Sequence, residues 1–323
     1  MNESEFYERV RQYNTEPLWV VGQEILSVEP VTRVEPHIWK WRELKKLLFT
    51  ATEEVEIQGA AERRVLLLAN PGLKGHHATS HTLTAAVQII KPGETAGTHR
   101  HTPAAIRFII EGDGAYTVVD GEKVVMHEGD LILTPQWTWH DHGNSTGAPV
   151  TWLDCLDVPL IQALNVMFFQ LYPTRGIQPV SSAPSASSLI YSWQDAYETL
   201  CRVEGNPFDG SVLEYRNSLT GGPTLPSLAC SLQRLRSGET TESHRHTSTS
   251  IYLAARGRGS TDVGDLRLEW EKGDVFVVPP WAAHRHGNPS SEEAVLFCMT
   301  DRPVLEAFGL YREEALTAQQ SLR

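Results

Sequence analysis

Three histidines in this sequence have a spacing that suits one metal ion. His99 and His101 flank Arg100, and His140 follows further along the chain. Residues i and i+2 of a β-strand point to the same face, so His99 and His101 would project together while Arg100 points away. Three neutral imidazoles leave a divalent ion its full charge and open positions for other ligands. We therefore expect His99, His101 and His140 to be metal ligands.

A cationic side chain follows the first two histidines. Arg107 lies two residues beyond Ala105 and would share its face of a strand. A guanidinium buried beside a metal without a partner would be strongly destabilised. A ligand carboxylate would instead give it a bidentate, charge-assisted pair. We expect Arg107 to bind an anionic group; the alternatives are that it reaches the surface or pairs with Glu111.

Other polar residues could complete such a site. His142 follows the third histidine by two residues and could be an acid, a base or a structural hydrogen-bonding group. Gln88 and Asp154 could orient a substrate or the ligand imidazoles, or could be ordinary buried polar groups. Arg63 is a weaker candidate, and Arg64 or neither could take its place.

The chain is a tandem duplication. Residues 92–102 recur 145 positions later, and residues 129–144 recur 144 positions later. Such internal self-similarity indicates two copies of one structural unit. The second copy repeats the three histidines as His244, His246 and His284. A second metal site is therefore possible on sequence grounds.

The second copy differs at two positions that matter for the first. Tyr252 stands in place of Arg107, and Cys298 stands in place of Asp154. The second copy could thus bind a metal but lacks the proposed anchor for an anion. We assign catalysis to the first copy.

The elements that must position these residues are short strands. Apolar and β-branched runs alternate with Gly-rich turns through both copies, as in residues 105–119. Many short strands at even spacing favour a small antiparallel barrel or jelly roll. Helical periodicity lies mainly outside the copies, at residues 4–13 (with Ser4 as N-cap), 39–49 and 192–203.

The duplication also predicts the domain organisation. The expected parts are an N-terminal helical or extended segment (1–60), a catalytic domain (61–175), a linker and helix (176–210) and a second domain (211–323). The linker includes the Ser-rich residues 181–188, whose composition is typical of connecting segments.

Bulk composition excludes several classes of partner. A net charge of −12 over 323 residues argues against a nucleic-acid or anionic-membrane surface. No run approaches the roughly 18 apolar residues of a membrane helix, and the N-terminus lacks the pattern of a secretory signal. The cysteines occur singly, which fits a reduced cytoplasm; they are Cys155, Cys201, Cys230 and Cys298.

The spacings in both halves resemble the two cupin motifs. The first is Gly, five residues, His-x-His, then a Glu position and a Gly; the second is Gly, five residues, Pro, then His and Asn. The resemblance implies a mainly β bicupin, with two tandem jelly-roll barrels and a few flanking helices. One departure stands out, because the Glu that commonly completes a cupin metal site is Ala105 in the first half and Ser250 in the second.

Four stretches narrow the resemblance further. Residues 92–94, 99–112, 134–144 and 152–157 resemble gentisate 1,2-dioxygenases and their relatives, which act on salicylate, substituted salicylates and 1-hydroxy-2-naphthoate. The resemblance implies an Fe(II) enzyme that inserts both atoms of O₂ between the carboxyl- and hydroxyl-bearing ring carbons. Carboxylate and hydroxyl would chelate the iron, and Arg107 would secure the carboxylate. Gentisate is the first expected substrate, with salicylate or a 5-substituted salicylate next, and a homotetramer is expected.

Two other functions compete with this interpretation. One is another metal-dependent bicupin reaction, such as that of an oxalate decarboxylase-like protein, against which the vacant Glu positions and Arg107 count. The other is a non-catalytic cupin that binds a small acid. Storage cupins usually lack the histidines, whereas both triads are present here.

Overall fold

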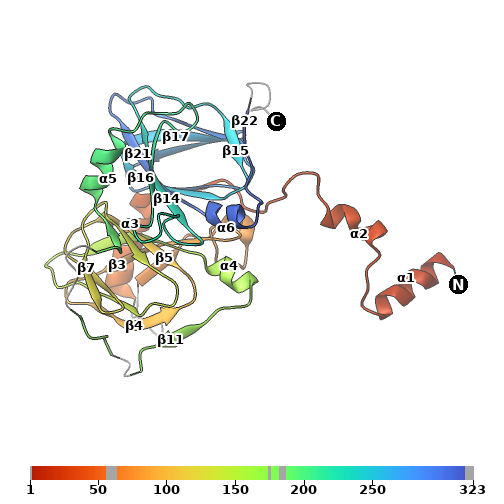
Figure 1. The fold of residues 1–323 in the computed structure, drawn as a ribbon, viewed down its shortest axis with the longest axis horizontal. Helices are drawn as coiled ribbons and strands as arrows, with labels where there is room; N and C mark the ends of the chain where they lie inside the picture. Colours follow the sequence, from red (N-terminus) through yellow and green to blue (C-terminus); the bar gives the residue numbers. More distant parts are fainter. Residues whose placement is uncertain (1, 56–63, 174–175, 182–186, 317–323) are drawn as a thin grey trace. The chain divides into compact units, whose positions relative to one another are not determined.

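The computed structural model describes residues 2–55, 64–173, 176–181 and 187–316 (Figure 1). The chain forms two compact units, Met1–Arg33 and Val34–Arg323. The first contains α1 (Glu3–Gln12) and α2 (Leu18–Ile25). The prediction of Ser4 as N-cap was wrong, because Asn2 and Glu5 form a reciprocal capping box that starts α1 earlier. α2 was not predicted, since Pro17 precedes it without a side-chain cap.

The first repeat consists of two facing sheets. One has the order β12-β8-β5-β10-β3-β2, with bounds β2 (Arg64–Leu67), β3 (Thr84–Ile90), β5 (Ala105–Glu111), β8 (Leu131–Thr134), β10 (Val150–Leu156) and β12 (Ile190–Tyr191). The other has the order β11-β4-β9-β6-β7, with bounds β4 (Thr95–His101), β6 (Tyr116–Val119), β7 (Glu122–Val125), β9 (His140–Gly143) and β11 (Phe169–Leu171).

The second repeat has the same two-sheet arrangement. Its larger sheet runs β1-β19-β16-β21-β14-β13, with bounds β1 (His37–Trp39), β13 (Ser211–Tyr215), β14 (Ala229–Leu235), β16 (Ser250–Arg256), β19 (Val275–Val278) and β21 (Ala294–Thr300). Its smaller sheet runs β18-β17-β20-β15-β22, with bounds β15 (His244–His246), β17 (Arg258–Val263), β18 (Leu266–Glu271), β20 (His284–Gly287) and β22 (Glu313–Ala315). The prediction of a mainly β protein with two jelly-roll repeats is confirmed.

The two repeats exchange edge strands. β1 precedes the first repeat but pairs with β19 of the second, and β12 precedes the second repeat but pairs with β8 of the first. A helix follows each exchanged strand: α3 (Trp41–Glu54) follows β1, and α5 (Trp193–Leu200) follows β12. Asp274 accepts from the backbone N–H of Trp41 at 2.8 Å, and Asp130 accepts from that of Trp193 at 2.9 Å. The Gly-Asp turn of the second repeat therefore caps α3, and the Gly-Asp turn of the first repeat caps α5; each helix lies next to the other repeat.

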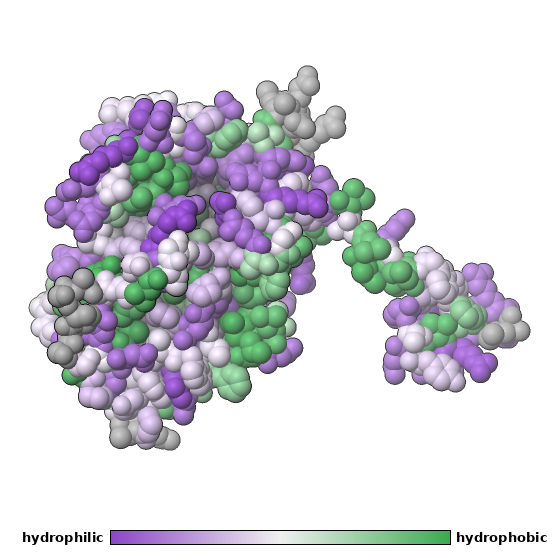
Figure 2. Space-filling view, in the orientation of Figure 1, coloured by the Kyte–Doolittle hydropathy of each residue, from purple (hydrophilic) through white to green (hydrophobic). Residues whose placement is uncertain are grey.

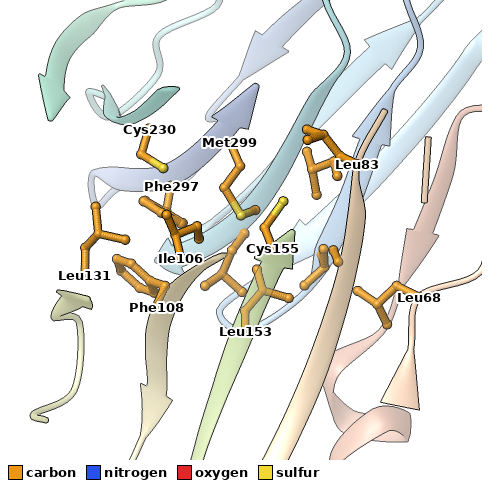
Figure 3. Close-up of a cluster of buried hydrophobic side chains, with 14 of the residues drawn as sticks. Leu68, Leu83, Ile106, Phe108, Leu131, Leu153, Cys155, Cys230, Phe297 and Met299 are labelled. Carbon is orange, nitrogen blue, oxygen red and sulfur yellow. The ribbon is translucent and has the colours of Figure 1, made fainter. Parts of the chain in front are cut away.

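The two larger sheets pack against each other through one hydrophobic core. Ile106 and Phe108 of β5 and Leu153 of β10 face Phe297 and Met299 of β21 (Figure 3). Phe108 stacks on Phe297 with the ring centroids 4.2 Å apart. Because side chains alternate along a strand, the odd-numbered residues of β5 and the even-numbered residues of β10 point into the first repeat. Packing of the core thus fixes which polar residues line the interior of that repeat.

A glycine at the end of β5 is required by close packing. Gly112 has φ +94°, and a Cβ there would lie 2.7 Å from the carbonyl oxygen of Pro149. We expect Gly112→Ala to lower the free energy of unfolding by about 1–3 kcal/mol, because both the backbone angle and the contact are unfavourable. Urea unfolding measures the change. Gly147→Ala is the matched control, because a Cβ there meets no atom within 4 Å; equal stability of the two variants would contradict the argument.

The other helix predictions were close to the structure. α3 begins two residues later than predicted and extends to Glu54, and α5 begins after Ser192, whose side chain accepts from the N–H of Asp195. The short helices α4 (Val158–Ala163) and α6 (Arg302–Ala307) and the 3₁₀ turn η1 (Pro71–Leu73) were not predicted. Residues 182–186, which belong to the Ser-rich stretch 181–188 of the predicted linker, lie outside the described residues. The domain boundaries stay predictions.

The visible surface of the unit Val34–Arg323 is largely polar. Figure 2 shows mostly hydrophilic and intermediate residues on the visible face of the unit Val34–Arg323, interrupted by separate hydrophobic patches. Within the described part of the chain, no helix is long and apolar enough to cross a membrane. All four cysteines are free thiols.

Candidate metal centre

The three histidines of the first repeat converge on one point. His99 and His101 lie on β4, and His140 lies directly opposite His99 on the neighbouring strand β9. One nitrogen of each ring lies within 4.8 Å of the others, and His99 and His140 are buried. Adjacent antiparallel strands bring these side chains together because opposing residues point to the same face of a sheet. The structure therefore assembles the triad that the spacing indicated.

Backbone carbonyls set the tautomer of each imidazole. In His99, Nδ1 lies 3.1 Å from the carbonyl oxygen of Gly97. In His101, Nδ1 lies 2.8 Å from that of Pro103, and in His140 it lies 3.0 Å from that of Thr138. A carbonyl can only accept, so each Nδ1 must carry the proton and each lone pair must lie on Nε2. Such second hydrogen bonds are typical of metal-ligating histidines. These residues fit a divalent metal ion bound through three Nε2 atoms.

The cluster lacks a carboxylate. Among the described residues it contains only the three histidines, and the buried Ala105 occupies the position of the usual cupin glutamate. An ion held by three neutral ligands keeps its full positive charge and open coordination positions. The site is therefore suited to binding an anionic chelating group.

Arg107 faces this cluster from the opposite sheet. It lies on β5 and is only 4% exposed. Its Nε donates to Oδ1 of Asp154 at 3.0 Å, and its guanidinium lies over the Trp152 ring, 4.7 Å from the centroid. Arg107 neither reaches the surface nor pairs with Glu111, whose carboxylate accepts from Lys45 instead. It is a buried cation between the two sheets.

Asp154 supplies the partner that keeps Arg107 charged. The two residues oppose each other in the β10–β5 pairing, and the other carboxylate oxygen of Asp154 accepts from Nε1 of Trp152 at 2.9 Å. Burial lowers the pKa of Arg107, and the Asp154 carboxylate opposes that shift. The sequence left open whether Asp154 orients a substrate or an imidazole or is an ordinary buried polar group; in the structure its carboxylate accepts from the guanidinium of Arg107.

His142 bridges Arg107 to the histidine cluster. Nδ1 of His142 lies 2.9 Å from Nη1 of Arg107 and 2.9 Å from the hydroxyl of Thr117, which donates to the carbonyl of Asp141. Nε2 of His142 lies 3.1 Å from Nη2 of Arg107. Both ring nitrogens thus contact the guanidinium, and His142 is suited to positioning Arg107. This geometry favours His140 over His142 as the third metal ligand.

Comparisons with known proteins agree with this geometry. Residues 86–156 and 231–300 each match the Cupin domain family. The chain is 38% identical to the 5-aminosalicylate 1,2-dioxygenase of Comamonas sp. (97% of this chain, 90% of the relative) and 34% identical to gentisate 1,2-dioxygenase 1 of Aquipseudomonas alcaligenes (96% and 95%). The crystal structure of salicylate 1,2-dioxygenase from Pseudaminobacter salicylatoxidans superposes with a TM-score of 0.87, at 32% identity, over 97% of both chains. The chain belongs to the gentisate 1,2-dioxygenase family. It is a ring-cleaving aromatic dioxygenase.

The other predicted residues of this dioxygenase are only partly brought to the site. Gln88 is buried on β3 opposite Trp152, on the face of the sheet that carries Arg107. Arg64 pairs with Glu94 and donates to the carbonyl of Ala51, so its side chain is engaged in these contacts. Arg63 lies outside the described residues.

The second repeat reproduces the triad without the anchor. The ligand atoms of His244, His246 and His284 also lie within 4.8 Å of one another. Tyr252 opposes Cys298 in the β16–β21 pairing, as Arg107 opposes Asp154 in the first repeat. The register thus agrees with the alignment of the two copies, and the second repeat lacks the Arg–Asp pair.

Two residues of the site were not recognised as such from the sequence. Thr117 contacts Nδ1 of His142, and Trp152 stacks on Arg107 while donating to Asp154. The position of Trp152, two residues before Asp154, could have placed it on the same face of the strand. Nothing in the local sequence distinguishes Thr117 from other strand threonines, because its partner lies on another strand.

Proposed function

We propose that this dioxygenase uses Fe(II), held by His99, His101 and His140, to cleave a salicylate-type aromatic acid between the carbons that carry the carboxyl and hydroxyl groups. The observation that carries the proposal is Arg107, a buried cation beside a cluster of three histidines that, among the described residues, includes no carboxylate. When bound, the iron would supply a Lewis acid and a means of activating O₂. The protein supplies geometry, charge and exclusion of water.

Arg107 would bind the substrate carboxylate. Its Nε is held by Asp154 and its Nη2 by His142, so the orientation of the guanidinium is fixed before a ligand arrives. A preorganised charge costs little reorganisation on binding. Trp152 covers one face of the guanidinium. The carboxylate and the ortho hydroxyl of the substrate would then occupy the open metal positions, which places the scissile bond at the centre of the site.

The relatives share one substrate feature. Their names specify 5-aminosalicylate, gentisate and salicylate, each with a carboxylate next to a hydroxyl group. We expect gentisate to be the first substrate, followed by salicylate or a 5-substituted salicylate. These acids differ away from the chelating edge, so a polar group near the 5-substituent would decide between them. A homotetramer and a cytoplasmic location stay predictions.

The proposal is tested by O₂ uptake. Anaerobically Fe(II)-loaded protein would be mixed with gentisate, salicylate, 5-aminosalicylate, 1-hydroxy-2-naphthoate and oxalate in turn. We expect uptake of one O₂ per molecule of one of the aromatic acids, together with loss of the aromatic absorbance of that acid. Turnover of oxalate alone would favour a decarboxylase-like reaction. Absence of turnover in protein that binds iron and one of the acids would favour a non-catalytic binding cupin.

Asp154 is expected to act as a positioning residue through Arg107. In Asp154→Asn one oxygen becomes an NH₂ group, which must face either Arg107 or the indole N–H, and both of these are donors. We expect KM to rise by about tenfold with a smaller loss of kcat and unchanged iron content. Steady-state kinetics with the substrate found above measure both constants. Asp113→Asn, on an exposed turn, is the control; an unchanged KM in Asp154→Asn would contradict this role.

A further inference from the structure

The residue between the two histidines of β4 makes a set of contacts on the outer face of the smaller sheet. Arg100 points away from the histidine cluster, because side chains alternate along a strand. The carbon at the centre of its guanidinium lies 4.3 Å from the ring centroid of Trp137 and 4.4 Å from that of Trp139. Nε and Nη2 both donate to Oε1 of Gln170, which lies opposite Arg100 on β11 (Figure 1). Two indole rings and one amide therefore hold the guanidinium.

The two tryptophans flank Thr138, whose carbonyl sets the tautomer of His140. Nδ1 of His140 lies 3.0 Å from that carbonyl oxygen. The backbone N–H of Trp137 also donates to the carbonyl of His101 at 2.9 Å. The segment between β8 and β9 thus contacts two of the three histidines of the cluster. A group that fixes this segment also fixes the orientation of those histidines.

The backbone of this segment is strained at Trp137. Its φ is +61°, in the left-handed region that a bulky side chain rarely adopts. Such a conformation persists only where the surrounding contacts over-determine it. The Trp137 ring is 38% exposed, so burial in a core does not hold it. Its ring contacts are with Phe168, at 5.9 Å between centroids, and with Arg100. The cation–π contact is thus one of the restraints that keep Trp137 in this conformation.

The second repeat reproduces half of this arrangement. Arg245 lies over Trp281 at 4.3 Å, and the backbone N–H of Trp281 donates to the carbonyl of His246 at 2.7 Å. Trp281 also has a positive φ, +64°. The position of Trp139 is taken by Ala283, so the first repeat alone adds a second indole. A contact that recurs with the same backbone conformation belongs to the His-x-His strand and its neighbouring segment rather than to one local surface.

We propose that Arg100 is a positioning residue for the metal site of the first repeat. By holding both tryptophans it keeps the Thr138 carbonyl against Nδ1 of His140, so that the lone pair of His140 stays on Nε2. The inference rests on the proposed role of the triad as an iron site, but the hydrogen bond that it concerns is present without a metal. Arg100 itself touches neither metal nor substrate, because it lies on the face of β4 opposite the ligands.

Nitrogen-15 NMR of the full-length, chelator-treated protein with labelled histidine tests this inference. At a pH where histidine is neutral, we expect His140 of the parent protein in the Nδ1–H tautomer alone, with its signals assigned by their loss in His140→Ala. In Arg100→Leu the Nε2–H tautomer is expected to appear, because the carbonyl is no longer held in place. Arg245→Leu is the matched control, since it removes the corresponding cation–π contact from the second repeat and should leave His140 unchanged.

Release of iron to a coloured Fe(II) chelator is the second readout. We expect the rate of release from the first triad to rise at least about tenfold in Arg100→Leu and to keep its parental value in Arg245→Leu. The phase of release that accompanies the loss of O₂ uptake identifies the ion of the first triad. A parent protein that binds no iron would sink the proposed function, whereas the tautomer of His140 would still decide the role of Arg100.

Two results would overturn the inference. The first is an unchanged tautomer of His140 in folded Arg100→Leu, whatever the rate of iron release. The second is an equal change in Arg245→Leu, which would show a general loss of stability rather than a local restraint. If Arg100→Leu does not fold, Arg100→Lys carries the test, because it keeps the charge but loses the planar group that stacks on the indoles. It is expected to show the same two changes at reduced size.

Discussion

Replacing Arg107 with alanine is expected to lower kcat/KM for ring cleavage by at least about a hundredfold while the protein keeps its iron. The side chain is the only described arginine between the two sheets of the first repeat that contacts both Asp154 and His142. Its loss removes the group that would bind the substrate carboxylate, but it removes no metal ligand. Oxygen-uptake kinetics and iron content, measured on the same preparation, separate these two effects.

The alanine variant also leaves a buried carboxylate unpaired. Asp154 would lose its cationic partner, which costs about 3–5 kcal/mol for a buried pair, so Tm must be measured too. Arg107→Lys keeps the charge near Asp154 but loses the planar fork, and we expect a smaller loss in which KM rises more than kcat falls. Arg64→Lys is the matched control, because Arg64 pairs with Glu94 in the same repeat. An unchanged kcat/KM in folded Arg107→Ala would refute the anchor role.

The sequence predicted the parts of the site that repeat with a fixed period. The two His-x-His motifs and the later histidines recur at nearly constant offsets, so the triads could be found without a structure. The alternation of strand side chains also placed Arg107 on the same face as Ala105. Strand alternation can be used without a structure because it relates residues only two positions apart.

What the sequence could not predict depends on contacts between distant strands. Asp154 meets Arg107 only because β10 and β5 pair in one particular register. His142 contacts Thr117 only because β9 pairs with β6. The exchange of β1 and β12 between the repeats was missed for the same reason, since each strand pairs far from its place in the chain.

His101→Ala is expected to remove the iron bound by the first triad and the ring-cleaving activity. Nδ1 of His101 donates to the carbonyl of Pro103, so its Nε2 carries the lone pair that would bind the ion. Two remaining imidazoles hold a divalent ion far more weakly, and we expect iron at the first site to fall below detection and kcat/KM to fall by at least about a thousandfold. Iron content by mass spectrometry and O₂ uptake measure the two losses.

The comparison between variants distinguishes a metal ligand from a substrate anchor. His127→Ala is the matched control, because His127 is exposed on a turn and pairs with Asp113 away from the triad. We expect it to retain both iron and activity. If the second repeat binds its own ion, His101→Ala will still retain about one ion per chain, so the activity of that protein tests the two repeats separately. Ring cleavage that persists with only the second ion present would show that Arg107 and the first triad are dispensable, because the second repeat carries Tyr252 in place of the arginine.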